Sequence, residues 1–281
     1  MAKKGWAKFP HEQKAFDYAG DKLAKAWDKL HAGDCEAFPD EARIAALLKK
    51  NPKLGKDAAA IAAELQDAWR AYHRGDFQAA FEAGEKLGPL GCSVAVKAAG
   101  IHAVYLLDDE DEQLKRWEQL TQMAEAATKA LPDEPNTHYR RAFALGRYSQ
   151  SISVAKALSQ GLAGKCKESL DKTLKLAPKH AEAHTALGLY HAEIVNKVGA
   201  MIGGLTYGAK ASTGEELLKA AIKLTPESPI AHIEYGNGLM LLYGDKKENE
   251  ASEAYVTAAK LKPRDAMEKL DVEYAKAQLE D

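Results

Sequence analysis

One phrase recurs along this chain at a fixed distance. The segment AWDKLHAGDCEAF, residues 26–38, returns 42 positions later as AWRAYHRGDFQAAF, residues 68–81. A second pair, ALGRYSQSISVAKAL at 144–158 and ALGLYHAEIVNKVGA at 186–200, has the same offset of 42. Self-similarity at such a period is typical of a fold built from stacked units, each too small to bury its apolar face alone. We therefore expect an array of repeated units.

Prolines divide the apolar helical runs at similar intervals. They are Pro89, Pro132, Pro178, Pro226 and Pro263, with spacings of 43, 46, 48 and 37. Proline ends a helix because it lacks the amide hydrogen and clashes with the preceding turn. Alanine is frequent and aromatic residues make up only 7% of the chain, which favours closely packed helices. The pattern predicts an all-α fold of helix pairs.

The last two units carry the residues that suggest a family. After Pro178, the run AEAHTALGLYHAEI contains Leu187-Gly188 and Tyr190. The next unit begins at Pro229, and its corresponding residues are Tyr235-Gly236, Ala251, Tyr255, Ala258 and Pro263. These residues resemble the tetratricopeptide repeat (TPR), whose Leu-Gly pair lets neighbouring helices approach closely. The resemblance implies a right-handed superhelical solenoid of helical hairpins.

The N-terminal part departs from this pattern. GDFQAAFEAGEKL at 75–87 resembles the Gly-Asp-aromatic turn of the family, whereas the earlier copy at Gly33-Asp34 runs into Pro39. Arrays need an atypical terminal element to shield their end from solvent. We therefore expect residues 1–57 to form a divergent helical N-terminal cap and residues 58–281 to form the TPR-like array. Trp27 and Trp69 are predicted to be inter-helix anchors, each filling its own layer.

Two repeats are elongated between their helices. The extra segments, SISVAKALSQGLAGK and NKVGAMIGGLTYGAK, are apolar and rich in small residues, and they are long enough to extend each first helix by two or three turns. The small residues recur every fourth position and would let two helices touch backbone to backbone: Ser151, Ala155 and Ser159, and Gly199 and Gly203. Tight packing of a helical hairpin and a lid or hydrophobic ligand slot are both compatible with this pattern. A membrane-inserting hairpin is the least favoured interpretation, because Lys156, Asn196 and Lys197 interrupt the apolar segments.

Elongated repeats of this kind also resemble uncharacterised proteobacterial TPR proteins. More distantly, residues 136–265 are similar to the TPR proteins associated with TRAP transporters and to those related to regulators of microtubule dynamics. The resemblance implies ligand binding or protein contact, and not catalytic turnover.

Charge and cysteine content restrict partners and compartment. The formal net charge is −2 with both signs interspersed, so we expect no nucleic-acid partner. Three distant cysteines suggest reduced thiols. The start MAKKGWAKFPHEQ lacks the apolar core of a signal peptide, and no stretch reaches the roughly 20 apolar residues of a membrane span. These features predict a cytoplasmic protein.

No catalytic or cofactor motif stands out. His180, His184 and His191 with Glu193 suggest a metal cluster at first sight, but the histidines are too far apart along a helix and no His-Glu-x-x-His pattern occurs. The glycines near Gly203 lack the lysine of a phosphate-binding loop. We expect no metal and no cofactor, and an enzyme is the third and least favoured interpretation.

The favoured hypothesis is a protein-interaction scaffold that binds an extended or C-terminal peptide in the concave groove of the array. If Leu145-Gly146 is equivalent to Leu187-Gly188, helical spacing directs Arg140, Arg147 and Gln150 toward this groove. The two arginines could hold a carboxylate of an acidic partner, or they could pair with carboxylates of the chain itself. The full set of expected contact residues is Arg140, Arg147, Gln150, His184, Leu189, Tyr190, His191, Glu193, Asn237 and Met240.

The alternative is a receptor for a small apolar or amphipathic ligand held between the elongated helix pairs. Its pocket would be enclosed and apolar. The expected lining residues are Ile152, Val154, Leu158, Val198, Met201 and Leu205. Oligomerisation through the same inserts would explain their composition without a ligand, and the sequence leaves the oligomeric state open.

Overall fold

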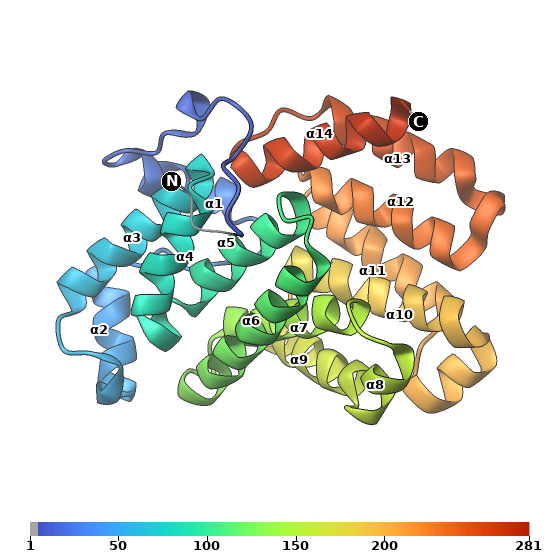
Figure 1. Cartoon of the computed structure of the whole chain (residues 1–281), viewed down its shortest axis with the longest axis horizontal. Helices are drawn as coiled ribbons and strands as arrows, with labels where there is room; N and C mark the ends of the chain where they lie inside the picture. The colour runs from blue at the N-terminus through green and yellow to red at the C-terminus, as the bar shows by residue number, and fades with distance from the viewer. Residues whose placement is uncertain (1–4, 281) are drawn as a thin grey trace. The chain divides into compact units, whose positions relative to one another are not determined.

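The computed structural model describes residues 5–280. In that range the regular elements are all helices, and there is no β-strand (Figure 1). The predicted all-α fold is thus confirmed. The described chain divides into two compact units, one within residues 5–29 and 36–162 and the other within residues 30–35 and 163–280. This division does not follow the predicted boundary at residue 57, which stays a prediction about sequence repeats.

The helices of the first unit are α1 (Lys22–Leu30), α2 (Glu41–Lys50), α3 (Ala58–Arg74), α4 (Phe77–Lys86), α5 (Cys92–Tyr105), α6 (Glu110–Ala130), α7 (Pro135–Gln150) and α8 (Val154–Ser159). Successive helices from α2 to α7 pack against one another, and α5 also contacts α3 and α7. Short turns of 3₁₀ helix lie at η1 (Lys14–Phe16), η2 (Pro52–Leu54) and η3 (Gly88–Leu90). In this unit α3, α5 and α7 are the first helices of successive pairs. They lie next to one another, because α3 contacts α5 and α5 contacts α7.

The second unit repeats this arrangement. Its elements are α9 (Leu162–Leu176), α10 (Ala181–Ile202), η4 (Gly203–Tyr207), α11 (Ala211–Leu224), α12 (Pro229–Tyr243), η5 (Gly244–Lys247), α13 (Glu248–Lys260) and α14 (Ala266–Glu280). Here α10, α12 and α14 are the first helices, since α10 packs on α12 and α12 on α14.

Local sequence explains where many of these helices begin and end. Asp57 and Asp109 precede α3 and α6, and each side chain accepts a hydrogen bond from a backbone N–H of the first turn. Such caps satisfy donors that have no partner within the helix. Gly75 ends α3 with φ +91°, in the left-handed region that glycine adopts without strain.

Glycines set the closest helix contacts in the second unit. A Cβ at Gly188 of α10 would lie 2.7 Å from Leu218 and 3.0 Å from the carbonyl oxygen of Gly214 in α11. At Gly236 of α12, a Cβ would lie 3.1 Å from the carbonyl oxygen of Ala251 in α13. Both glycines of the predicted Leu-Gly positions in this unit therefore allow close helix approach, as expected.

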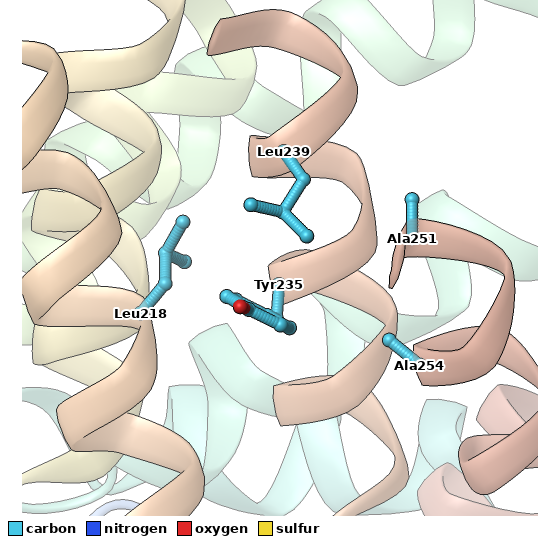
Figure 2. Packing of buried hydrophobic residues seen from close by; sticks show 5 residues of the cluster. All are labelled: Leu218, Tyr235, Leu239, Ala251 and Ala254. Carbon is cyan, nitrogen blue, oxygen red and sulfur yellow. The ribbon is translucent and has the colours of Figure 1, made fainter. Parts of the chain in front are cut away.

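The apolar core around α12 joins three helices. Figure 2 shows Leu218 of α11 facing Tyr235 and Leu239 of α12, with Ala251 and Ala254 of α13 on the other side. All five side chains are buried. Small residues on α13 and large ones on α11 and α12 interdigitate, which fills the layer at close packing.

The two elongated repeats differ from each other. In the second elongated repeat, α10 runs to Ile202, but its backbone bends at Gly199, where φ is +82°. The π-helical turn η4 follows directly. After α7 the chain leaves the helix at Gln150, and Ser153 caps the separate short helix α8. The prediction that each first helix extends by two or three turns is wrong for the first insert, where the cap at Ser153 starts a new helix. In the second insert the regular helix breaks at Gly199, and a second helical stretch follows the break.

Trp27 and Trp69 lie in one layer. Their ring centroids are 5.8 Å apart with the rings nearly perpendicular, and both side chains are buried. Edge-to-face packing of this kind is a favoured aromatic geometry. The prediction that each fills its own layer is wrong, because the repeated phrase places the two rings against each other.

Candidate functional site

A histidine near the start of three first helices hydrogen-bonds to the loop before its helix. In each case Nε2 reaches the carbonyl oxygen of a proline six residues earlier, at 2.8–2.9 Å. The pairs are His138 with Pro132, His184 with Pro178, and His232 with Pro226. Nε2 is therefore the donor in all three rings. His184, an expected contact residue, closes the loop between helices.

These pairs define the register of the repeats. Counting four residues from each histidine makes Ala142, Gly188 and Gly236 equivalent. The expected equivalence of Gly146 with Gly188 is wrong by four residues, about one helical turn. Consistently, Ala142 is buried, and a Cβ at Gly146 would meet no atom of the described residues within 4 Å.

The corrected register explains the position of Arg140. Its side chain is 1% exposed, and Nε donates to Oγ of Ser93 at 3.3 Å. Oε2 of Glu36 accepts hydrogen bonds from the hydroxyl of Ser93 and, at 2.8 Å, from the amide of Asn136. A buried guanidinium is tolerated when a carboxylate and hydrogen bonds accompany it. Arg140 therefore belongs to the polar interior between α5 and α7 and shares no exposed face with Arg147.

Arg147 and Gln150 lie at the C-terminal end of α7. Arg147 is partly exposed and Gln150 is exposed, and Nη1 of the arginine is 3.5 Å from Oε1 of the glutamine. Both remain accessible to a partner in this unit. Their predicted role stays a prediction.

Tyr190 and His191 hold the segment that follows α10. The hydroxyl of Tyr190 donates to the carbonyl oxygen of Tyr207 at 3.2 Å, and Nδ1 of His191 accepts from the backbone N–H of Lys210 at 3.1 Å. Burial raises the pKa of Tyr190 to about 12 and lowers the pKa of His191, with Lys167 acting in the same direction on the histidine. These neutral rings anchor η4 and the start of α11 to α10.

The remaining expected residues lie on two adjacent helices. Leu189 of α10 packs against the core cluster of Leu218, Tyr235 and Leu239, and Glu193 forms an ion pair with Lys197 at 3.1 Å. On α12, the Asn237 amide donates to Glu234 at 2.9 Å and accepts from the hydroxyl of Tyr255 at 2.6 Å. Met240 is 40% exposed. Because α10 packs on α12, these residues occupy neighbouring first helices.

The side chains expected to line an enclosed pocket are mostly exposed. Val198, Met201 and Leu205 are 36%, 78% and 85% exposed, and Val154 and Leu158 are 64% and 55% exposed. Ile152 is partly buried. A lining side chain is covered by the pocket walls. The prediction of an enclosed pocket around these residues is therefore wrong for this structure.

The segment before α1 packs against the helices of the first unit in a way that the sequence did not predict. Residues 5–20, here named the strap, precede α1 and contain no regular structure except the turn η1. The ring of Trp6 lies under the guanidinium of Arg116 at 4.0 Å and contacts the rings of Phe81 and His102. Nη2 of Arg116 also donates to the carbonyl oxygen of Gly5 at 3.0 Å. One arginine of α6 thus holds both a side chain and the backbone of the strap.

The other end of the strap is held in the same manner. Arg70 of α3 donates from Nε to the carbonyl oxygen of Tyr18 and from Nη2 to that of Gly20, each at 3.2 Å. Between the two ends, Phe9 is buried beside Phe77 and against the turn at Gly75. The aromatic residues at 6, 9, 16 and 18 were the available signal, but their spacing fits neither a helix nor a strand.

Burial controls the charge beside Trp6. It lowers the pKa of His102 to about 4, and the neighbouring Arg116 acts in the same direction. The imidazole is therefore neutral at pH 7, and Nδ1 can accept from Nη1 of Arg116 at 3.2 Å. The charged groups beside Trp6 are therefore the Arg116 guanidinium, which stacks over the indole, and the neighbouring carboxylate of Glu112.

The structure also bears on groups that could bind a metal ion, on the thiol of Cys92 and on the apolar length of the helices. Across residues 5–280, no group of three or more His, Cys, Asp or Glu side chains is placed to hold a metal ion. Burial raises the pKa of Cys92 to about 12, so its thiol stays protonated and unreactive at neutral pH. No helix of the described chain is long and apolar enough to cross a membrane.

The sequence matches no family model and no curated protein. The structure is similar to the crystal structure of a thermophilic TPR protein from Thermus thermophilus, with a TM-score of 0.55 and 16% sequence identity. The match covers 78% of this chain and 99% of that one. The predicted TPR-type helical fold is thereby confirmed, whereas kinship with particular proteobacterial families stays a prediction.

Proposed function

We propose that this chain, whose fold is that of a TPR-type helical array, is a protein-interaction scaffold that holds an extended segment of a protein partner. The fold itself suggests an interaction scaffold in general. The strap supports the narrower proposal, because it is an extended segment that the helix pairs of the first unit already hold.

Two kinds of contact hold the strap. Arg116 and Arg70 donate to backbone carbonyl groups, which every peptide offers. The seats for Trp6 and Phe9 are specific, since each accepts one aromatic ring. A partner segment would use the same division, with backbone hydrogen bonds for affinity and side-chain seats for specificity.

In the second unit, the proposed peptide surface lies on α10 and α12. Its accessible members are Glu193, Asn237 and Met240. In the first unit, Arg147 offers a partly exposed cation for an acidic side chain or a C-terminal carboxylate. His184, Tyr190 and His191 would act indirectly, by holding the helices that present these residues.

The alternative, a small-ligand receptor, has less support, because the apolar residues that would enclose the ligand are exposed. We propose no catalytic activity.

The experiment supplies the strap in trans. A chain that starts at residue 21 is titrated into a fluorescein-labelled peptide of residues 5–20, and binding is followed by fluorescence anisotropy. We expect saturable binding that Arg116→Gln weakens about tenfold, or about 1.4 kcal/mol, because the substitution removes the cation over Trp6. Lys115→Gln, an exposed neighbour on α6, is the matched control.

Circular dichroism verifies that the shortened chain keeps its helices. If that folded chain does not bind the peptide, or if Arg116→Gln binds as tightly as Lys115→Gln, the proposal that this surface holds extended segments is wrong.

A further inference from the structure

The C-terminal end of α10 and the turn η4 that follows it expose apolar side chains. Residues 196–208, here named the α10 tip, contain Val198, Met201, Ile202 and Leu205. A non-helical bend at Gly199 separates Val198 from Met201 and Ile202, and Leu205 follows in the π-helical turn η4. They are 36–85% exposed, whereas the large apolar residues nearer the base of α10 are buried or partly buried. Monomeric proteins rarely leave such a patch in water without a use for it.

The charged residues within the tip segment are basic, whereas the acidic side chains of Glu193 and Asp171 lie at its base. Between Glu193 and Glu215 there is no acidic residue, although the whole chain has 41 acidic residues against 39 basic ones. The charged residues within this stretch are Lys197 and Lys210. Lys210 is exposed, and Lys197 pairs with Glu193 at the base of the tip. The tip therefore presents an apolar patch with a cationic border.

The insert around α8 has the same chemistry. No acidic residue lies between Glu134 and Glu168. Val154 and Leu158, four residues apart, are both more than half exposed, and Lys156 between them is exposed as well. The two inserts follow the first helices of successive repeats, so the same surface chemistry occurs twice in the chain.

The composition of the tip discriminates among occupants. A protein interface carries about one hydrogen bond per 100–200 Å², yet residues 198–205 contain no polar side chain. A symmetric contact with a second copy would bring two tips, each bordered by Lys210, against each other, and like charges repel. The interfacial layer of a bilayer with anionic headgroups accepts both the apolar side chains and the lysines.

We propose that the α10 tip inserts its apolar side chains into the headgroup layer of an anionic membrane and so attaches the protein peripherally. The backbone bends at Gly199 within the tip and at Gly208 at its end, with φ +82° and +64°, and Tyr190 and His191 fix its base. Tyr207, a partly buried ring within the tip, has the amphipathic character common at membrane interfaces.

The test is flotation of the full chain with two kinds of vesicle, phosphatidylcholine alone and phosphatidylcholine mixed with phosphatidylserine. We expect binding to the mixed vesicles, weaker binding at high salt, and little binding to phosphatidylcholine alone. The double variant Met201→Glu, Leu205→Glu should lose binding at least tenfold, since both side chains are largely exposed and the substitution leaves the core untouched. Leu279→Glu, a 41% exposed residue of α14, is the matched control.

Three results would overturn the proposal. The first is a wild-type chain that does not float with the mixed vesicles, and the second is equal binding to both vesicle types. The third is a double variant that binds as well as Leu279→Glu. Sedimentation equilibrium on the same samples identifies the competing explanation: a wild-type dimer that the double variant dissociates, without vesicle binding, assigns the patch to a second copy.

Discussion

The α10–α11 and α12–α13 hairpins share a base and differ in their tips. Each first helix begins with a histidine bonded to the preceding proline loop, and each has a glycine where the second helix approaches. Beyond this base, α10 continues into η4 with exposed apolar side chains. By contrast, α12 stops before Gly244 at φ +56°, and a short turn leads into α13.

The difference indicates that the base of each hairpin determines its stability, whereas the α10 tip determines the chemistry of the exposed surface. The base of each hairpin contains the glycine contacts and the buried core, so changes there should cost free energy of unfolding. The α10 tip touches little of the base except through Tyr190 and His191. Its apolar side chains are exposed and so contribute little to packing, and a surface role is the simplest account of them.

The largest expected effect is at the glycine contact. Gly188→Ala places a Cβ 2.7 Å from Leu218, so the helices must move apart, and we expect a loss of about 2 kcal/mol in unfolding free energy. Gly204→Ala in the tip, where the nearest atom would be 3.7 Å away, should change it by less than about 0.5 kcal/mol. Urea unfolding measures both, and equal losses would remove the distinction between base and tip.

The next effect concerns the feature that both hairpins share. His184→Ala and His232→Ala each remove one hydrogen bond to a proline carbonyl, and each should cost about 1 kcal/mol. Similar losses in the two variants are expected, because the bonds have nearly the same length and both lie near solvent. A loss in only one hairpin would contradict the shared role.

A smaller effect depends on pH. Glu215 accepts hydrogen bonds from Lys219 and Tyr243, and these bonds lower its pKa, as Lys247 and Tyr235 do for Glu250. A carboxylate with a lowered pKa stabilises the fold above its unfolded-state pKa of roughly 4.3, and this contribution is lost as pH falls through the folded-state value.

Glu215→Gln should therefore reduce stability at pH 7 by less than about 1 kcal/mol and reduce the loss of stability on acidification. Thermal unfolding from pH 7 to pH 3 measures this. Lys223→Gln, an exposed residue of α11, is the control, and a wild-type pH profile in Glu215→Gln would contradict the assignment.

The smallest expected effect is in the tip itself. The double variant Met201→Glu, Leu205→Glu should change the unfolding free energy by less than about 0.5 kcal/mol, since both side chains are already in water. A loss of more than about 1 kcal/mol in urea unfolding would mean that the patch packs against the protein.

Much of the fold could be predicted from the sequence, because helical periodicity and proline punctuation are local properties. Which residues of successive repeats are equivalent could not be predicted from the similarity of short sequence segments. The phrase ALG recurs at 144 and 186, but helix contacts follow the proline–histidine pairs, which repeat at 46 and 48. That error placed Arg140 on the surface, whereas it is buried beside Ser93.

The candidate surfaces were predicted in part. The unusual composition of both inserts was evident, yet composition alone does not decide between a pocket lining and an exposed patch. That choice depends on whether neighbouring helices cover the side chains, and for Met201 and Leu205 they do not. The strap was missed because its aromatic residues pack on α3–α6 through tertiary contacts that have no sequence period.

The most direct test is hydrogen–deuterium exchange with and without phosphatidylserine-containing vesicles. The central claim is that the α10 tip binds a membrane surface, whereas the base of the α10–α11 hairpin packs like the base of the α12–α13 hairpin. It predicts slower exchange at residues 196–208 on addition of vesicles, with no change at residues 244–247 in the shorter hairpin. Unchanged exchange in the tip, or equal slowing in both turns, would contradict it.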